Sequence, residues 1–249
     1  KGYEYQYKVT VLIALATRAD KIKLFVEKEG SEDALLTIEN NDILSNIEIQ
    51  VKREKNLIDI PKIVNWLSHF QERKSNNNLL QKLIESEQTI SLFITHSRCS
   101  DSTLNLKTDY LSFEHHKSLS FSKGWFNSFR EELKDLKFGS SKLMTERELF
   151  CKKQSENFKK IADLSKVLER CLILEEFTDE KVDDCVLKLL NSNYSIALSR
   201  TDIVYLQLLE IVKSGRDTGE EISKKIYNRC KLIFRSGPNI VKDLKRIES

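Results

Sequence analysis

The sequence contains few of the residues that interrupt regular structure, because its 249 residues include only 7 glycines and 2 prolines. This scarcity argues against a loop-rich sandwich and against a linker protein. No apolar run approaches the ~20 residues that a membrane-spanning helix requires, and no signal-peptide pattern opens the chain. We therefore expect a soluble protein that is not exported.

The most specific metal-binding and nucleotide-binding motifs are missing as well. The five cysteines are odd in number and form no C-x-x-C pair, which argues against a zinc site and a disulfide framework. Their positions favour core packing in a reducing cytoplasm. No phosphate-binding glycine loop is present, so the chain is not expected to be a nucleotide-driven motor.

The four histidines also lack a metal-binding spacing such as HxH or H-E-x-x-H. His115 and His116 lie in a polar, loop-like stretch that is a weak candidate for a metal site. His96 follows a predicted strand, and it either approaches an active cleft or simply ends that strand.

The charge balance gives little information about partners. Lys and Arg total 41 against 38 Asp and Glu, and a formal charge of +3 is too small to indicate a polyanionic ligand. Two local basic groups are candidates for phosphate contacts, and each also suits an ordinary solvated surface. They are Lys52, Arg53 and Lys55, and Lys152, Lys153, Lys159 and Lys160.

The first half of the chain alternates helical and strand patterns, which predicts an α/β domain over residues 1–139. Asn40, Asn41 and Asp42 provide the turn of a predicted antiparallel hairpin. The predicted elements are a helix at Glu4–Arg18, a strand at Ile22–Val26, a hairpin of Ala34–Glu39 with Ile47–Lys52, helices from Pro61 and around Leu79–Ile84, and a buried strand at Thr89–Thr95.

After roughly Gly139 every strong periodicity is helical, so we expect residues 140–249 to form a helical region. Thr178 and Thr201 are predicted to cap two of its helices. Thr218, with Glu221 three residues later, resembles a capping box for another helix. This region is expected either to cover the cleft of the first domain or to link to a sensor domain in the same polypeptide.

The segment Glu48-Ile49-Gln50-Val51-Lys52 carries the most chemical information. Alternate side chains of a strand share a face, so Glu48, Gln50 and Lys52 are predicted to form one polar wall. With a hairpin turn at about residues 41–44, Asp33 falls roughly opposite Lys52. It is then diagonal to Gln50, about 7–8 Å away.

These residue types suit phosphodiester hydrolysis, which needs oxygen ligands for Mg²⁺ or Mn²⁺ and a positive charge near the phosphate. We predict that Asp33 is the principal metal ligand and that Gln50 contributes its carbonyl oxygen. Lys52 positions or deprotonates the attacking water. Glu32 or Glu48 adds a second ligand or a proton acceptor. The alternative is that Glu48, Gln50 and Lys52 are only the solvated face of an ordinary strand.

Three blocks of the sequence together resemble a known family. Gly2-Tyr3-Glu4-Tyr5-Gln6, Glu29-Gly30-Ser31-Glu32-Asp33 and Ile49-Gln50-Val51-Lys52 occur in the same order in the double-stranded DNA endonuclease domain of antiphage proteins, which include CBASS effectors and Avs-type STAND proteins. The resemblance covers about residues 2–130. It implies a PD-(D/E)xK restriction-endonuclease-like core, although Gln50 replaces the acidic residue of the wider superfamily and no proline precedes Asp33.

The resemblance also implies an activity, which is Mg²⁺-dependent cleavage of double-stranded DNA in the cytoplasm by a protein that forms a homo-oligomer when activated. Asp33, Gln50 and Lys52 match the D, Q and K positions of the family, and Gln6 matches the glutamine of its N-terminal helix. Two alternatives stay open. One is a catalytically silent module that binds nucleic acid or protein, and the other is a nuclease acting on RNA.

Overall fold

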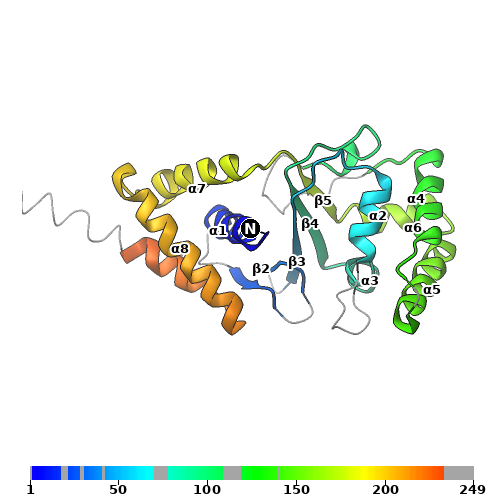
Figure 1. Ribbon diagram of the computed structural model, residues 1–249, viewed down its shortest axis with the longest axis horizontal. Helices are drawn as coiled ribbons and strands as arrows, with labels where there is room; N and C mark the ends of the chain where they lie inside the picture. Colours follow the sequence, from blue (N-terminus) through cyan, green and yellow to red (C-terminus); the bar gives the residue numbers. More distant parts are fainter. Residues whose placement is uncertain are drawn as a thin grey trace, which may run out of the picture. The chain divides into compact units, whose positions relative to one another are not determined.

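The computed structural model describes residues 2–17, 22–28, 31–40, 43–69, 78–108, 119–139 and 141–232 (Figure 1). The chain divides into two compact units, which we call unit 1 and unit 2. Unit 1 comprises Lys1–Val51 and Phe177–Ser249, and unit 2 comprises Lys52–Glu176. Neither border coincides with the domain boundary predicted near residue 140. Unit 1 is built from two distant stretches of the chain.

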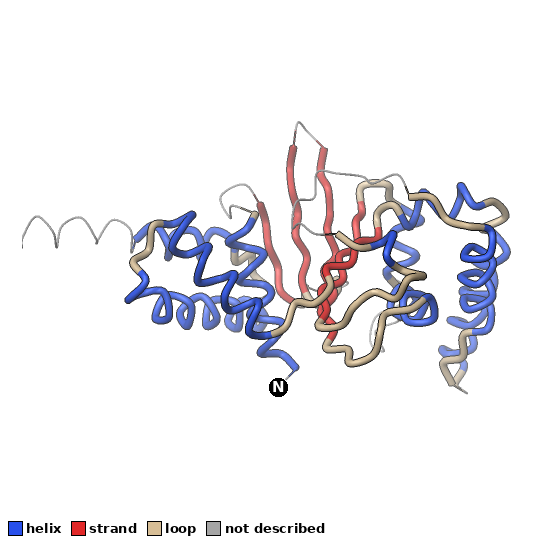
Figure 2. The backbone as a smooth tube through the Cα atoms, turned by 90° about the horizontal axis from the view of Figure 1, so that it is seen from above, coloured by secondary structure: helices blue, strands red, loops and turns tan. Residues whose placement is uncertain are grey.

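Unit 1 contains three antiparallel strands and a group of helices (Figures 1 and 2). Strand β1 pairs with β2, and β2 pairs with β3. The helix α1 packs against α7 and α8, and α8 also packs against β1. The elements are α1 (Gly2–Ala16), β1 (Ile22–Val26), β2 (Ala34–Asn40), β3 (Ile43–Lys52), α7 (Asp179–Tyr194), α8 (Leu198–Thr218) and a further helical stretch at 223–232.

The predicted hairpin is confirmed, and its buried face explains why it forms. Ala34 pairs with Ile49 and Leu36 pairs with Ile47, and these four side chains are all buried. The opposite face of β3 therefore carries Glu48 and the other even-numbered residues.

The predicted register of this hairpin is wrong by two residues. Asn40 pairs with Ile43, so only two residues connect the strands, whereas the prediction assumed a longer turn. Continuing the pairing from Ala34 and Ile49 brings Asp33 opposite Gln50 rather than opposite Lys52.

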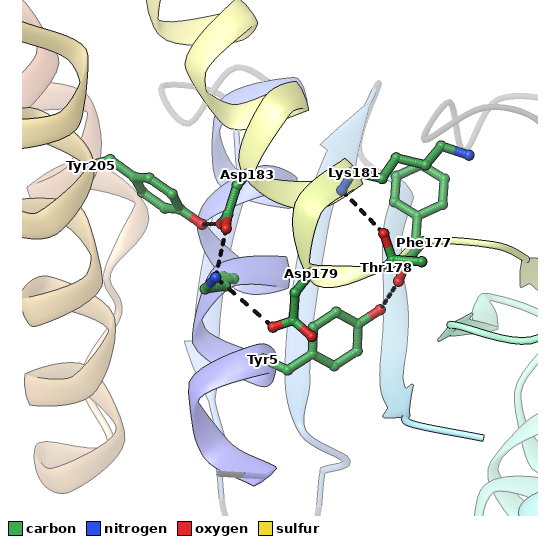
Figure 3. Close-up of polar contacts among 8 residues, drawn as sticks. Tyr5, Phe177, Thr178, Asp179, Lys181, Asp183 and Tyr205 are labelled. Atoms are coloured by element: carbon green, nitrogen blue, oxygen red, sulfur yellow. Dashed lines mark hydrogen bonds and ion pairs between the residues drawn. The ribbon is translucent and has the colours of Figure 1, made fainter. Parts of the chain in front are cut away.

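The predicted N-terminal helix is confirmed as α1, and polar contacts attach it to α7 and to Phe177, which lies just before α7 (Figure 3). The Tyr5 hydroxyl donates to the Phe177 carbonyl at 2.5 Å. Lys8 Nζ lies 2.6 Å from Asp183 Oδ2, and Tyr205 donates to the other oxygen of Asp183 at 2.7 Å. Asp183 thus receives one donor from α1 and one from α8. This arrangement fixes the rotation of α1 about its axis.

Unit 2 contains a parallel strand pair and five α-helices among its described residues. Every residue of β4 is buried, as the continuous apolar run predicted, and β5 pairs with it in parallel. The elements are α2 (Ile60–Ser68), α3 (Leu79–Glu85), β4 (Thr89–Thr95), the 3-10 helix η1 (Leu104–Leu106), α4 (Lys123–Asp135), α5 (Lys142–Asn157), α6 (Ile161–Leu168) and β5 (Cys171–Leu174). The α/β class is confirmed for the described part of the chain.

Strand β5 corrects the prediction that all regular structure after Gly139 is helical. Its four residues, Cys171–Leu174, are too few to show a strand period. The strand forms because β4, about eighty residues earlier, offers it a buried partner.

Two helix starts also differ from the prediction. Thr178 caps α7 as predicted, but α8 begins at Leu198, and Thr201 lies inside it and donates to the Leu198 carbonyl at 2.8 Å. Thr218 ends α8 rather than opening the next helix, where Glu221 accepts from the backbone of Ser223 at 2.6 Å.

The predicted core role of the cysteines is confirmed for four of the five. Cys99, Cys151, Cys171 and Cys230 are buried, and Cys185 is half-buried. Burial raises the pKa of Cys151 to about 11 and the pKa of the other three buried thiols to about 12.

No helix in the described ranges has the length and apolarity of a membrane span.

This burial predicts how the thiols react with a disulfide reagent at pH 8. Cys185 should be modified first, and the other four should react only after unfolding, because a buried thiol that stays protonated is a poor nucleophile. Mass spectrometry of the native protein and of the Cys185→Ser variant will count the modified thiols. Rapid modification of two or more thiols in the native parent would contradict the packing.

Candidate functional site

A group of polar side chains at the start of β2 and the end of β3 lies buried in unit 1. Glu32 and Glu48 are each 6% exposed and Gln50 is 2% exposed, whereas Asp33 is half-buried. The alternative of a solvated strand face is therefore wrong for Glu48 and Gln50. Because burial of unpaired polar groups is costly, their partners decide what the group can do.

Hydrogen bonds connect the three buried side chains. The backbone N–H of Glu32 donates to Glu48 Oε2 at 3.0 Å, and Gln50 Nε2 donates to Glu32 Oε2 at 2.6 Å. The fold thus brings together Glu48 and Gln50, which were predicted to share a face of the strand. It also places beside them Glu32, which was predicted as a second ligand or proton acceptor. We call Glu32, Glu48 and Gln50, with the neighbouring Asp33, the acidic cluster.

Asp33 connects this cluster to α1. Gln6 Nε2 donates to Asp33 Oδ1 at 2.8 Å, and the backbone N–H of Val51 donates to Asp33 Oδ2 at 2.7 Å. Thr10, one turn further along α1, donates to the Gln6 carbonyl at 2.8 Å. Gln6 and Asp33, which the sequence singled out separately, are therefore in direct contact, and the orientation of the Asp33 carboxylate is fixed by two donors.

A further residue beside this site is Arg216 of α8, which no local pattern in the sequence indicates. Its Nε donates to Glu27 Oε2 at 2.7 Å, its Nη1 lies 3.2 Å from the Tyr7 hydroxyl, and its guanidinium lies 3.8 Å from the centre of the Tyr3 ring. The hydrogen bond to Glu27 raises the pKa of Arg216 above its ordinary value. The backbone N–H of Glu27 in turn donates to the Asp33 carbonyl at 3.0 Å.

These contacts form a closed ring that runs from Asp33 through Gln6 and α1 to Arg216, and back through Glu27. Every member belongs to unit 1, and the ring holds α1 at a fixed distance from the end of β1. Arg216 thereby helps to set where Gln6 meets Asp33. Only the folded chain brings it there, since 189 residues separate it from Glu27.

Lys52 is the last residue of β3, two positions after Gln50, so alternation places both side chains on one face of the strand. It is half-buried and is the first residue of unit 2. In that unit, the backbone N–H of His96 donates to the Lys52 carbonyl at 3.4 Å. His96 is therefore a neighbour of the Lys52 backbone, whereas His115 and His116 lie outside the described residues.

One buried oxygen of the acidic cluster is available to accept a further contact. Gln50 Oε1 is buried and has no hydrogen-bond partner among the residues that the structure describes. Rotating the amide by half a turn would bring this oxygen against the Glu32 carboxylate, where two acceptors would repel each other, so the assigned orientation is the favourable one. An unpaired buried acceptor among carboxylates is a position where a cation lowers the free energy.

The donor chemistry also fits a hard divalent ion. Mg²⁺ and Mn²⁺ prefer carboxylate and amide oxygens, which Asp33, Glu32, Glu48 and Gln50 all provide. In the described ranges no three carboxylate, histidine or cysteine side chains already converge as a metal-binding group. A bound ion would therefore use the Gln50 oxygen together with carboxylates that now accept hydrogen bonds from N–H groups.

In comparisons with protein-family models, with characterised proteins and with solved structures, the chain finds no match. The residues of the site therefore carry the functional argument.

The unpaired oxygen of Gln50 predicts that Mg²⁺ or Mn²⁺ stabilises the folded protein. At a metal concentration one hundred times the dissociation constant, the free energy of unfolding should rise by about 2.7 kcal/mol. Calorimetric melting with and without metal will measure this rise. Gln50→Met should abolish most of it, and Gln50→Glu, which adds a charge at the same position, should increase it. An equal rise in the parent and in Gln50→Met would show that the ion binds elsewhere.

Proposed function

We propose that this chain is a metal-dependent endonuclease that hydrolyses phosphodiester bonds of double-stranded DNA, with a centre formed by Asp33, Gln50 and Lys52. The observation that carries the proposal is the buried, unpaired Gln50 Oε1 beside the carboxylates of the acidic cluster. A strand that only faced solvent would not bury Glu48 and Gln50 in this way.

Each residue has a role that its surroundings support. Asp33 and Gln50 would hold Mg²⁺ or Mn²⁺, and Glu48 or Glu32 would add a carboxylate oxygen. The bound ion supplies a Lewis acid that makes water more acidic and offsets charge on the phosphate. Lys52 contributes a fixed positive charge near the phosphate and orients the attacking water. Gln6 keeps the Asp33 carboxylate oriented through its 2.8 Å hydrogen bond.

The choice of double-stranded DNA and of antiphage defence rests on the ordered sequence blocks that resemble the PD-(D/E)xK endonuclease domain. Two of these blocks contain Gln6 and Asp33, which are in contact, and the third contains Gln50 and Lys52. Glu29 and Gly30 of the second block lie outside the described residues. Activation by homo-oligomerisation and a cytoplasmic location belong to the same proposal.

One observation favours a second candidate, a catalytically silent module that binds nucleic acid or protein. Both oxygens of Asp33 already accept N–H donors, which is an arrangement that can also serve stability alone. In that case DNA binding would survive chelation of metal and would not depend on Lys52.

Cleavage of a supercoiled plasmid with Mg²⁺ tests the proposal, under conditions that permit oligomerisation and also in the full-length assembly. Asp33→Ala and Lys52→Ala should each lower the rate by at least about 100-fold, because each removes a group that acts on the developing charge. Lys23→Ala, at an exposed position of β1, is the matched control and should leave the rate unchanged. Equal cleavage by all four proteins, or intact plasmid in every assembly, would contradict the proposal.

A further inference from the structure

Helix α8 of unit 1 presents large apolar side chains to solvent. Leu198, Ile203 and Leu206 are 72%, 60% and 64% exposed, whereas Val204 and Leu208, on another face of the same helix, are buried. A single exposed leucine needs no explanation, but a group of apolar side chains on one helix marks an interaction surface. The outer face of α8 therefore has the composition of a contact site.

Four residues of α8 have the spacing of a helix–helix contact, and we call them the α8 stripe. They are Asp202, Leu206, Leu209 and Lys213, and the steps between them are four, three and four residues. This alternation keeps the four side chains on one side of the helix, where a second helix can pack along them. Leu209 is half-buried and the other three are exposed. The α8 stripe thus has an apolar centre, with a negative charge at one end and a positive charge at the other.

The charges of the α8 stripe are complementary to those of a second copy in one arrangement. When two α8 helices lie antiparallel, with Leu206 of each against Leu209 of the other, Asp202 of each copy falls opposite Lys213 of the other. A parallel pair would place equal charges together. An antiparallel pair centred on Leu206 would place Asp202 opposite Glu210, and such like-charge pairs are unfavourable. Charge therefore selects a single register for the contact.

Both charged ends of the stripe are accessible in the single copy. Asp202 is exposed, and the Lys213 side chain is 58% exposed, with its Nζ 4.0 Å from Glu210 of the same helix. An ion pair of this length between two exposed side chains contributes little to stability. Lys213 can therefore turn toward Asp202 of a second copy without leaving a buried partner.

We propose that the α8 stripe is a contact between two copies of this chain, related by a two-fold axis that passes between Leu206 and Leu209. Leu198 and Ile203 lie on either side of the stripe and add apolar area. The inference rests on α8 alone, and within the proposed function it names a face for the homo-oligomer. The contact is smaller than the ~20–30 residues that a stable interface uses on each side, so the dimer forms only at high local concentration.

Sedimentation equilibrium over a series of protein concentrations, up to the millimolar range, tests the contact. The weight-average mass of the parent should rise from that of one copy toward that of two. Leu206→Glu should keep the protein monomeric throughout, because it places a charge against Leu209 of the other copy. The control is Leu149→Glu, which makes the same change at a leucine of α5 that is 60% exposed. It should dimerise as the parent does.

Charge reversal tests the register of the contact. Asp202→Lys and Lys213→Asp should each raise the dissociation constant of the dimer at least about tenfold, because the symmetric contact contains the pair twice. The double variant Asp202→Lys/Lys213→Asp should return to the parent value, which a variant that had merely misfolded would not do.

Three results would overturn the proposal. They are a parent that stays monomeric at every concentration, a dimer that Leu206→Glu leaves intact, and a double reversal as weak as the single ones. A monomeric parent is also the result expected if the α8 stripe packs against another part of the same polypeptide. The measured quantity is mass rather than cleavage, so failure of the dimer contact and failure of the nuclease activity are distinguishable.

Discussion

The burial of carboxylates beside an amide oxygen that has no hydrogen-bond donor is the constraint on which the proposed site depends. Glu32 and Glu48 are almost fully buried; Glu48 accepts a hydrogen bond from the backbone N–H of Glu32, and Glu32 accepts one from Gln50 Nε2. Gln50 Oε1 remains without a donor. Replacing these groups by apolar residues would avoid the cost of burial, so their presence is more easily explained by a ligand than by stability.

The helix α1 connects this cluster to the rest of unit 1. On one side, Lys8 attaches it to Asp183 of α7 and Tyr5 attaches it to Phe177 just before α7. Tyr205 of α8 also donates to Asp183 (Figure 3). On another side α1 presents Gln6 to Asp33. Helices α7 and α8 come from the last third of the chain, and they thus hold α1 in place. Helix α1 in turn orients Asp33 through Gln6. Helices α7 and α8 belong to the architecture of the site and are not an appended region.

The local elements of unit 1 were predictable from the sequence because their signals are local. Short β-type runs predicted β1 and the β2–β3 hairpin, with the turn-forming Asn40, Asn41 and Asp42 between the hairpin strands, and helical spacing predicted α1. The register was not predictable, since it depends on a connection of two residues between Asn40 and Ile43 instead of a longer one. Because of that difference, Asp33 lies opposite Gln50 rather than opposite Lys52.

Long-range features could not be read from the pattern. Strand β5 forms only because β4 pairs with it, and Arg216 reaches Glu27 only because α8 folds back onto the start of the chain. Unit 1 likewise combines residues from both ends of the sequence, because segments far apart along the chain pack together. For the site, the residue types of Gln6, Asp33, Glu48 and Gln50 were informative, but the burial of Glu48 and Gln50 and the contact between Gln6 and Asp33 required the fold.

A crystal structure of the protein soaked with Mn²⁺, with anomalous scattering collected at the manganese edge, would show whether the acidic cluster binds a divalent ion. We expect an anomalous peak within coordination distance of Gln50 Oε1 and of a carboxylate oxygen of the acidic cluster. A well-ordered crystal with no peak there, and with Gln50 Oε1 instead hydrogen-bonded to a protein donor, would contradict it.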